Sequence, residues 1–205
     1  LFGRWNAFAW DARVLERRVF NLACQLRELS APASDAEADQ VATDLARQAR
    51  FLLALRDGPL RAAERAAAAA VAGVALGGRA GTRLLDKALV RLCHVLPRSV
   101  TQDGGHATRS PQAALELLFD LSTVDDALGQ RRLASPDELM RALDRLAGAV
   151  RFFTLADGRL AAFQGGEALP GAYVAAARAQ DELGERPTPV ARNGYHRLEA
   201  RSLQV

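Results

Sequence analysis

An alanine-rich stretch at residues 60–76 constrains the fold of this 205-residue chain more than any other sequence feature. Most residues from Ala62 to Leu76 are alanine, and the rest include valine, leucine and one glycine. Because alanine forms helices more readily than any other residue, this stretch predicts a helix. Its small side chains let neighbouring helices approach closely. Alanine is frequent throughout the chain, so the composition favours an all-α fold.

Helix start and stop signals divide the sequence into seven helical segments. In the first segment, apolar residues such as Leu15 and Val19 recur at helical spacing. Glycine at Gly77 ends one segment, and a capping box of Ser135 and Glu138 begins another. The predicted helices span residues 11–30, 34–56, 60–76, 82–96, 111 to beyond 121, 135–153 and 170–183.

The predicted helices are joined by short turns, so neighbours are expected to pack antiparallel as helical hairpins. Residues 1–184 form the expected helical domain. Residues 185–205 begin as a polar linker and continue from Gly194 as a strand-like stretch. A lone strand does not satisfy its backbone hydrogen bonds, and the chain begins with Leu1 rather than methionine. We therefore expect a part of a larger protein, with a β-domain following residue 205.

The composition argues against several classes of function. The formal net charge is +3, but Lys87 is the only lysine and the arginines are spread along the sequence. A nucleic-acid-binding protein gathers its positive charge on one face. Cys24 and Cys93 have no metal-ligand spacing, and the three histidines lie far apart. The low-charge run from Ala66 to Gly78 is too short to cross a bilayer. Nucleic acid, a metal in this chain and a membrane span are therefore not expected.

Two inter-helix loops, residues 103–109 and 157–166, carry more polar groups than a connection requires. Alternate loops of helical hairpins project on the same side, so the two loops can line one cleft. The candidate binding residues are Asp103, Gly104, Gly105, His106, Arg109 and Gln164.

Each candidate also has a plain structural interpretation. His106 can contact a ligand or act in catalysis, or it can bond a neighbouring backbone carbonyl. Arg109 can pair with a carboxylate or sulfate of a ligand, or with Asp103 or Glu116 of the chain itself. The two glycines of the loop supply positive φ for a tight turn and also permit close approach of a ligand. The sequence therefore assigns no catalytic residue.

Four short motifs occur in order along the chain. They are Arg18-Val-Phe-Asn21, Asp103-Gly-Gly-His106 with Arg109-Ser-Pro111, Asp157-Gly158 with Phe163-Gln-Gly165, and Gly194-Tyr-His-Arg-Leu-Glu199. Together they resemble the helical domain of the heparinase II/III family of polysaccharide lyases. The resemblance implies an incomplete α/α toroid followed by a β-sandwich domain. It also implies β-elimination of an acidic, uronic-acid-containing polysaccharide, a periplasmic location and a structural zinc ion in the β-domain.

The motifs depart from the family at its catalytic positions. Ala113 stands where the family's tyrosine is expected, and Pro59 stands where its asparagine is expected. Alanine and proline have no proton to give. The leading hypothesis is therefore a lyase in which this chain supplies one wall of the substrate cleft. The alternatives are a non-catalytic glycan-binding domain and a helical interaction module, with a cytoplasmic location as the second possibility. The oligomeric state is not set by the sequence.

Overall fold

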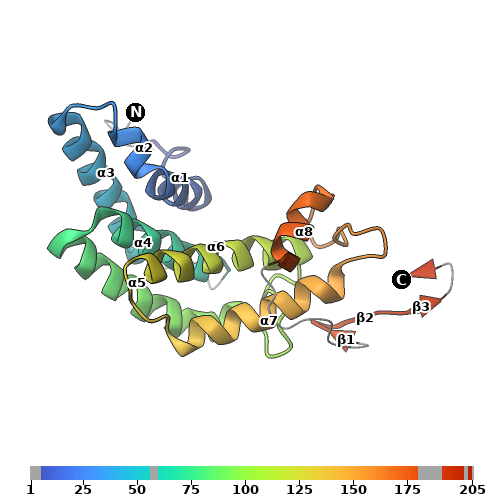
Figure 1. The fold of residues 1–205 in the computed structure, drawn as a ribbon. Coiled ribbons are helices and arrows are strands. Elements are labelled where there is room, and N and C mark those ends of the chain that lie inside the picture. Colours follow the sequence, from blue (N-terminus) through green and yellow to red (C-terminus); the bar gives the residue numbers. More distant parts are fainter. Residues whose placement is uncertain (1–5, 56–59, 180–190, 201–202, 205) are drawn as a thin grey trace. The chain divides into compact units, whose positions relative to one another are not determined.

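The computed structural model describes residues 6–55, 60–179, 191–200 and 203–204, most of which are helical (Figure 1). The helices are α1 (Ala12–Cys24), α2 (Leu26–Ser30), α3 (Asp35–Ala54), α4 (Ala62–Leu76), α5 (Gly78–Ser99), α6 (Pro111–Gln130), α7 (Asp137–Phe153) and α8 (Gly171–Ala179). The strands are β1 (Ala191–Arg192), β2 (Tyr195–His196), β3 (Glu199–Ala200) and β4 (Leu203–Gln204). The mainly helical fold is confirmed, whereas the toroidal arrangement stays a prediction.

The chain divides into two compact units. Unit 1 comprises residues 1–95 and 123–135, and unit 2 comprises residues 96–122 and 136–205. The predicted domain boundary between residues 184 and 185 lies outside the described residues, so that division stays a prediction. Among the described residues, no helix is both long and apolar enough to span a membrane.

The alanine-rich helix α4 forms the centre of unit 1, where it packs against α1 and α3. The five alanines from Ala66 to Ala70 are buried. The backbone of α4 also lies very close to α5, because a Cβ atom on Gly73 would come within 2.7 Å of the backbone nitrogen of Leu85. Small side chains are thus what allows three neighbouring helices to approach α4.

Several helix ends differ from the predicted ones. The single helix expected over residues 11–30 is interrupted at Gln25, where φ is −102° and ψ is 6°. The helix expected from Thr82 begins at Gly78, and the left-handed φ values of Gly77 (61°) and Gly78 (57°) separate it from α4. The capping box predicted at the start of α7 is wrong, because the Ser135 hydroxyl bonds the Asp125 carboxylate and Pro136 occupies the N-cap. A capping box of Ser34 and Glu37, which the sequence analysis did not predict, forms at the start of α3.

Unit 2 is built around α7 and the first half of α6, and α8 packs against α7. Its buried side chains include Leu115, Leu121, Leu146 and Phe153. Isolated bridges close both polar loops, one between Val100 and His106 and one between Thr154 and Leu160.

A short hairpin lies near the C-terminal end of unit 2. Strand β1 pairs with β2, with Ala191 opposite His196. Asn193 and Gly194 form the turn between them with φ values of 51° and 77°, the left-handed conformations that a tight two-residue hairpin requires. The expectation of an unpaired strand beginning at Gly194 is therefore wrong, because its first residues pair with the residues just before it.

Candidate functional site

Five of the predicted binding residues lie in the loop between α5 and α6, in unit 2. The His106 side chain is buried, with 1% exposure. Its Nδ1 lies 2.7 Å from the Thr108 hydroxyl oxygen and accepts a hydrogen bond from the Thr108 backbone N–H at 3.2 Å. Because its imidazole is enclosed by the loop, His106 holds the loop together rather than facing solvent.

Asp103 is engaged with the C-terminal hairpin of the same unit. Its carboxylate accepts hydrogen bonds from the Thr101 hydroxyl at 2.5 Å and from the backbone N–H of Asn193. Burial raises the pKa of Asp103, but these bonds and the backbone N–H of Gly105 outweigh it and hold the pKa below its ordinary value. The charged form of Asp103 is therefore stabilised by contacts within unit 2.

The two glycines of this loop allow close contact between parts of unit 2. A Cβ atom on Gly104, where φ is 94°, would lie 2.1 Å from the carbonyl oxygen of Arg145 in α7. A Cβ atom on Gly105 would lie 2.1 Å from Cγ of Asn193. Protein atoms thus occupy the space that a ligand near the glycines would enter. A binding role for these residues stays a prediction.

Arg109 contacts the hairpin rather than Asp103 or Glu116. Its guanidinium carbon lies 4.8 Å from the centre of the Tyr195 ring. Its Nε donates to the carbonyl oxygen of Asn193 at 3.2 Å, and a terminal nitrogen donates to that of Gly194 at 3.3 Å. Arg109 therefore fixes the turn of the hairpin against the start of α6.

Gln164 is exposed in the second polar loop, with a φ of 53°. Its neighbour Phe163 packs on Tyr195, with ring centres 4.4 Å apart. The Glu167 backbone N–H donates to the Gln112 side chain at 2.7 Å. The structure therefore brings the two polar loops close together, through the aromatic ring of Tyr195 and the first turn of α6.

Sequence reasoning missed the hairpin residues that complete this cluster. Arg192 donates to the carbonyl oxygen of Arg145 at 3.3 Å. Arg197 donates to the carbonyl oxygens of Phe152 at 2.6 Å and Thr154 at 3.0 Å, so it caps the C-terminal end of α7. The Asn-Gly pair at the turn is a strong hairpin signal and would have located these residues.

Unit 1 contains a buried ionic cluster between α1 and the start of α4. Glu16 is fully buried, and the Arg61 guanidinium binds its two carboxylate oxygens at 2.6 and 3.3 Å. Arg61 also lies 3.8 Å from the buried Glu64. Burial raises the pKa of Glu16, and the hydrogen bond and charge of Arg61 offset only part of that rise. Arg61 adopts a φ of 83°, in the left-handed region that residues with a side chain rarely occupy.

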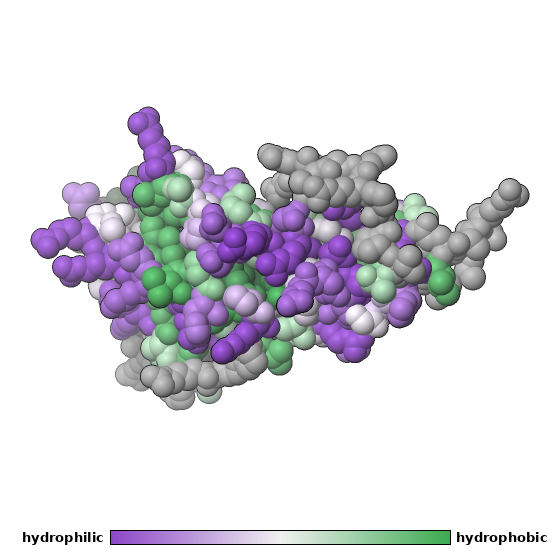
Figure 2. Space-filling view, turned by 90° about the horizontal axis from the view of Figure 1, so that it is seen from below, coloured by the Kyte–Doolittle hydropathy of each residue, from purple (hydrophilic) through white to green (hydrophobic). Residues whose placement is uncertain are grey.

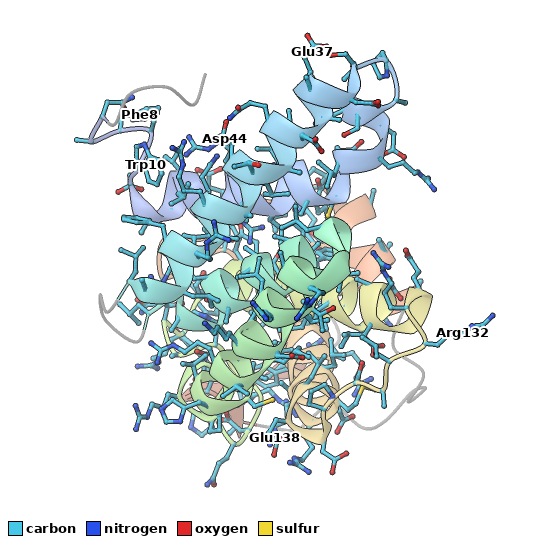
Figure 3. The ribbon with its side chains drawn as sticks, turned by 90° about the vertical axis from the view of Figure 1, so that its left-hand side faces the viewer. Phe8, Trp10, Glu37, Asp44, Arg132 and Glu138 are labelled. Carbon is cyan, nitrogen blue, oxygen red and sulfur yellow. The ribbon has the colours of Figure 1, made fainter. Side chains whose placement is uncertain are left out.

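An exposed aromatic surface lies at the N-terminal side of unit 1, and we call it the Phe8–Trp10 surface. Phe8 is 77% exposed. Trp10 packs edge-on against Phe51 with ring centres 5.1 Å apart, and the Arg47 guanidinium lies 5.9 Å from the Trp10 ring. Figure 3 shows Phe8 and Trp10 at the end of unit 1, near Asp44 of α3. Asp44 in turn pairs with Arg47 at 2.9 Å.

Unit 1 also has an open groove of about 630 Å³ between α2, α4 and the last turns of α6. Leu26, Val71 and Val74 provide apolar lining. At its edge, Arg27 pairs with Glu28 at 3.2 Å and Arg131 donates to the Val74 carbonyl oxygen at 2.7 Å. The groove combines no catalytic or metal-binding set, and no group of three or more potential metal ligands occurs among the described residues.

Comparisons with known proteins give one informative match. No protein-family profile matches the chain, and no solved structure matches it. FtsZ-localized protein C from Caulobacter vibrioides is 53% identical over 206 residues. The match covers all of this chain and 36% of the relative, so the chain spans about a third of that protein's length.

This match corrects the functional predictions from the sequence. The resemblance to the heparinase II/III family is wrong, because the whole chain aligns at 53% identity with a protein named for its localisation with FtsZ. The predictions of a polysaccharide lyase, of its glycan-binding alternative and of an acidic polysaccharide as partner fall with it. Two of the four supposed motifs consist largely of Asp-Gly, Gly-Gly and Ser-Pro, which begin turns and helices in many folds.

Proposed function

We propose that this chain is a helical part of a protein that associates with the bacterial division machinery, through FtsZ or a component bound to it. The observation that carries the proposal is the 53% identity to FtsZ-localized protein C along the entire chain. The identity extends over the whole chain, so the relative contains a segment of the same length and closely similar sequence. The helical units described above then contribute to that association.

The proposal also favours the cytoplasm over the periplasm as the site of action, because FtsZ is a cytoplasmic protein. A toroidal arrangement of the helical hairpins and a zinc ion in a following β-domain remain predictions without support from this match. They are not needed for a binding function.

The Phe8–Trp10 surface is the best candidate for the partner contact. Aromatic and arginine side chains supply most of the binding energy at protein interfaces. Phe8 is 77% exposed, and burying its ring against a partner would add a large apolar contribution at little conformational cost. Trp10, Phe51 and Arg47 hold one another in place beside it.

Binding of the full-length protein to purified FtsZ tests this proposal. We expect Phe8→Ser to weaken binding about tenfold, the loss of one interface anchor. Met140→Ser is the matched control, because Met140 is an exposed apolar residue of unit 2 at 46% exposure. The proposed function would be refuted if the unaltered protein bound neither purified FtsZ nor FtsZ in extracts that contain the other division proteins. Equal effects of the two substitutions would refute the assignment of the surface.

A further inference from the structure

Helix α5 carries a stripe of positive charge that its linear sequence conceals. Four cations, Arg79, Arg83, Lys87 and Arg91, and after them His94, follow one another at intervals of three or four residues. With 3.6 residues per helical turn, this spacing places them along one side of the helix over about 22 Å. All five lie in the part of α5 that belongs to unit 1. Arginines are therefore spread along the whole chain, and yet several basic residues also gather on one face of α5.

The stripe faces away from the core of unit 1. The opposite side of α5 carries Leu84, Leu85, Ala88 and Leu92, which are all buried. On the stripe itself, Arg79, Arg83, Lys87 and His94 are exposed and Arg91 is half-buried. Hydrophilic residues cover much of the face of the molecule that Figure 2 shows.

The cations of the stripe have no acidic partners within the described part of the chain. No ion pair to any of the five occurs among the described residues. Asp86, at the edge of the stripe, is the only carboxylate residue in α5. Some exposed arginines elsewhere in unit 1 pair with neighbours, as Arg47 does with Asp44 and Arg27 with Glu28. Unpaired like charges on one helix repel each other, and a partner of opposite charge would relieve that repulsion.

An apolar side chain at the centre of the stripe indicates which class of partner binds there. Val90 lies between Lys87 and His94 on the same side of α5 and is 73% exposed. A nucleic-acid backbone presents phosphates and sugars and no apolar side chain to Val90, and one valine is too small to anchor a helix in a bilayer, where large apolar side chains are needed. A protein segment can supply carboxylates for the cations and an apolar side chain for Val90.

We infer that this face of α5 binds an acidic protein segment in which carboxylate residues flank an apolar one. The cations steer and orient the segment, and Val90 contacts its apolar residue. The site is separate in sequence from the Phe8–Trp10 surface, and the inference does not depend on FtsZ. Binding of the acidic segment without binding of FtsZ, either purified or in division-protein extracts, would refute the proposed function and leave this inference standing.

The test measures fluorescence anisotropy of the full-length protein with a labelled peptide of about 16 residues, long enough to span the stripe as a helix. Glutamate and aspartate flank a single central leucine in this probe. We expect saturable binding that weakens as salt rises through the physiological range. The double substitution Arg83→Glu/Lys87→Glu should weaken binding at least about tenfold, and Val90→Ser about threefold. Replacing the leucine of the probe with serine should reproduce the Val90→Ser loss.

Controls separate charge at this face from charge in general. The double substitution Arg132→Glu/Arg178→Glu changes the net charge equally at exposed positions outside α5 and should leave binding unchanged. If charge reversal perturbs folding, as circular dichroism would show, Arg83→Gln/Lys87→Gln should still weaken binding. The inference is overturned if both double substitutions weaken binding equally. Tighter binding of single-stranded DNA or of anionic phospholipid vesicles than of the peptide would also overturn it, in favour of that partner.

Discussion

Removing Arg61 provides a sharp test of how unit 1 is held together. The Arg61 side chain is 19% exposed, and its guanidinium binds both oxygens of Glu16, whose side chain is 1% exposed. The substitution Arg61→Ala therefore leaves a buried carboxylate without its principal partner. Arg17, at 3.3 Å from the same carboxylate, stays in place and retains part of the compensation.

The expected loss is about 3 kcal/mol in the free energy of unfolding. Breaking a buried pair by removing one partner costs about 3–5 kcal/mol, and the remaining contact with Arg17 puts this pair at the lower end. For a chain of this size, about 3 kcal/mol corresponds to a fall in Tm of about 6–12 °C. Arg61→Gly should lose about 1 kcal/mol less than Arg61→Ala, because glycine adopts the left-handed backbone conformation at this position without strain.

The loss should also depend on pH. Burial raises the pKa of Glu16, so the folded state holds this proton more tightly than the unfolded chain does. The contribution of the Glu16 proton to the free energy of unfolding is complete below the pKa of Glu16 in the unfolded chain. This contribution is lost as the pH rises through the pKa of Glu16 in the folded state. Without Arg61 the folded pKa of Glu16 rises further. The difference between Arg61→Ala and the unaltered protein should therefore shrink as the pH falls from 7 towards 4.

Urea unfolding followed by circular dichroism at several pH values measures these quantities. Glu16→Gln is the matched variant, because it keeps the shape of the side chain and removes the titrating group. Its stability should lack the Glu16 component of the pH dependence. A loss below about 1 kcal/mol for Arg61→Ala at pH 7, typical of an exposed pair, would refute the buried ion pair as a stabilising element.

Two further substitutions test the packing of each unit. Gly73→Ala should destabilise unit 1 by about 1–3 kcal/mol in urea unfolding, because its Cβ would meet the backbone of Leu85 at 2.7 Å. Gly129→Ala, also in a helix but with open space around it, should be neutral or slightly stabilising, and equal losses would contradict the close α4–α5 contact. Asp103→Asn should cost at most about 1 kcal/mol at pH 7, since this carboxylate is exposed in part. Because hydrogen bonds hold the pKa of Asp103 below its ordinary value, the stability that it contributes is lost as the pH falls through the folded pKa, and unfolding curves of the two proteins should converge in acid. A difference that persists unchanged in acid would contradict the role of these bonds.

Local signals in the sequence predicted most of the helices but few of the contacts between them. The N-cap at Ser34 acts over a single turn, so the sequence located the start of α3 correctly. The pair of Glu16 and Arg61 joins residues 45 positions apart, and nothing in the local pattern around either residue indicates the other. The pairing becomes apparent only when α1 packs against α4.

The contacts of the polar loop at residues 103–109 could not be predicted from the local sequence either. The predicted positive φ is found at Gly104 but not at Gly105, and the sequence does not indicate that Arg145 and Asn193 occupy the adjacent space. Histidine is a residue type that often acts in functional sites, but the His106 side chain is buried in this structure. That burial depends on how the loop folds back on itself, which the sequence does not show. Function was predicted wrongly because turn motifs shared by many folds were given the weight of a family signature.

The sequence analysis also missed the basic face of α5. Arginines counted along the sequence are dispersed, and this dispersal argued against any concentrated basic face. Spacing of three or four residues becomes adjacency only once a helix is formed, which is how Arg79, Arg83 and Lys87 come to share one side of α5. A helical-wheel count within each predicted helix would have revealed the stripe.

Association with the division machinery is tested most directly by imaging the full-length protein as a fluorescent fusion in its native cells while FtsZ is depleted. The fusion should coincide with FtsZ at the division site and disperse when FtsZ is lost. A distribution that does not coincide with FtsZ, or that is unchanged by FtsZ depletion, would contradict the proposed function.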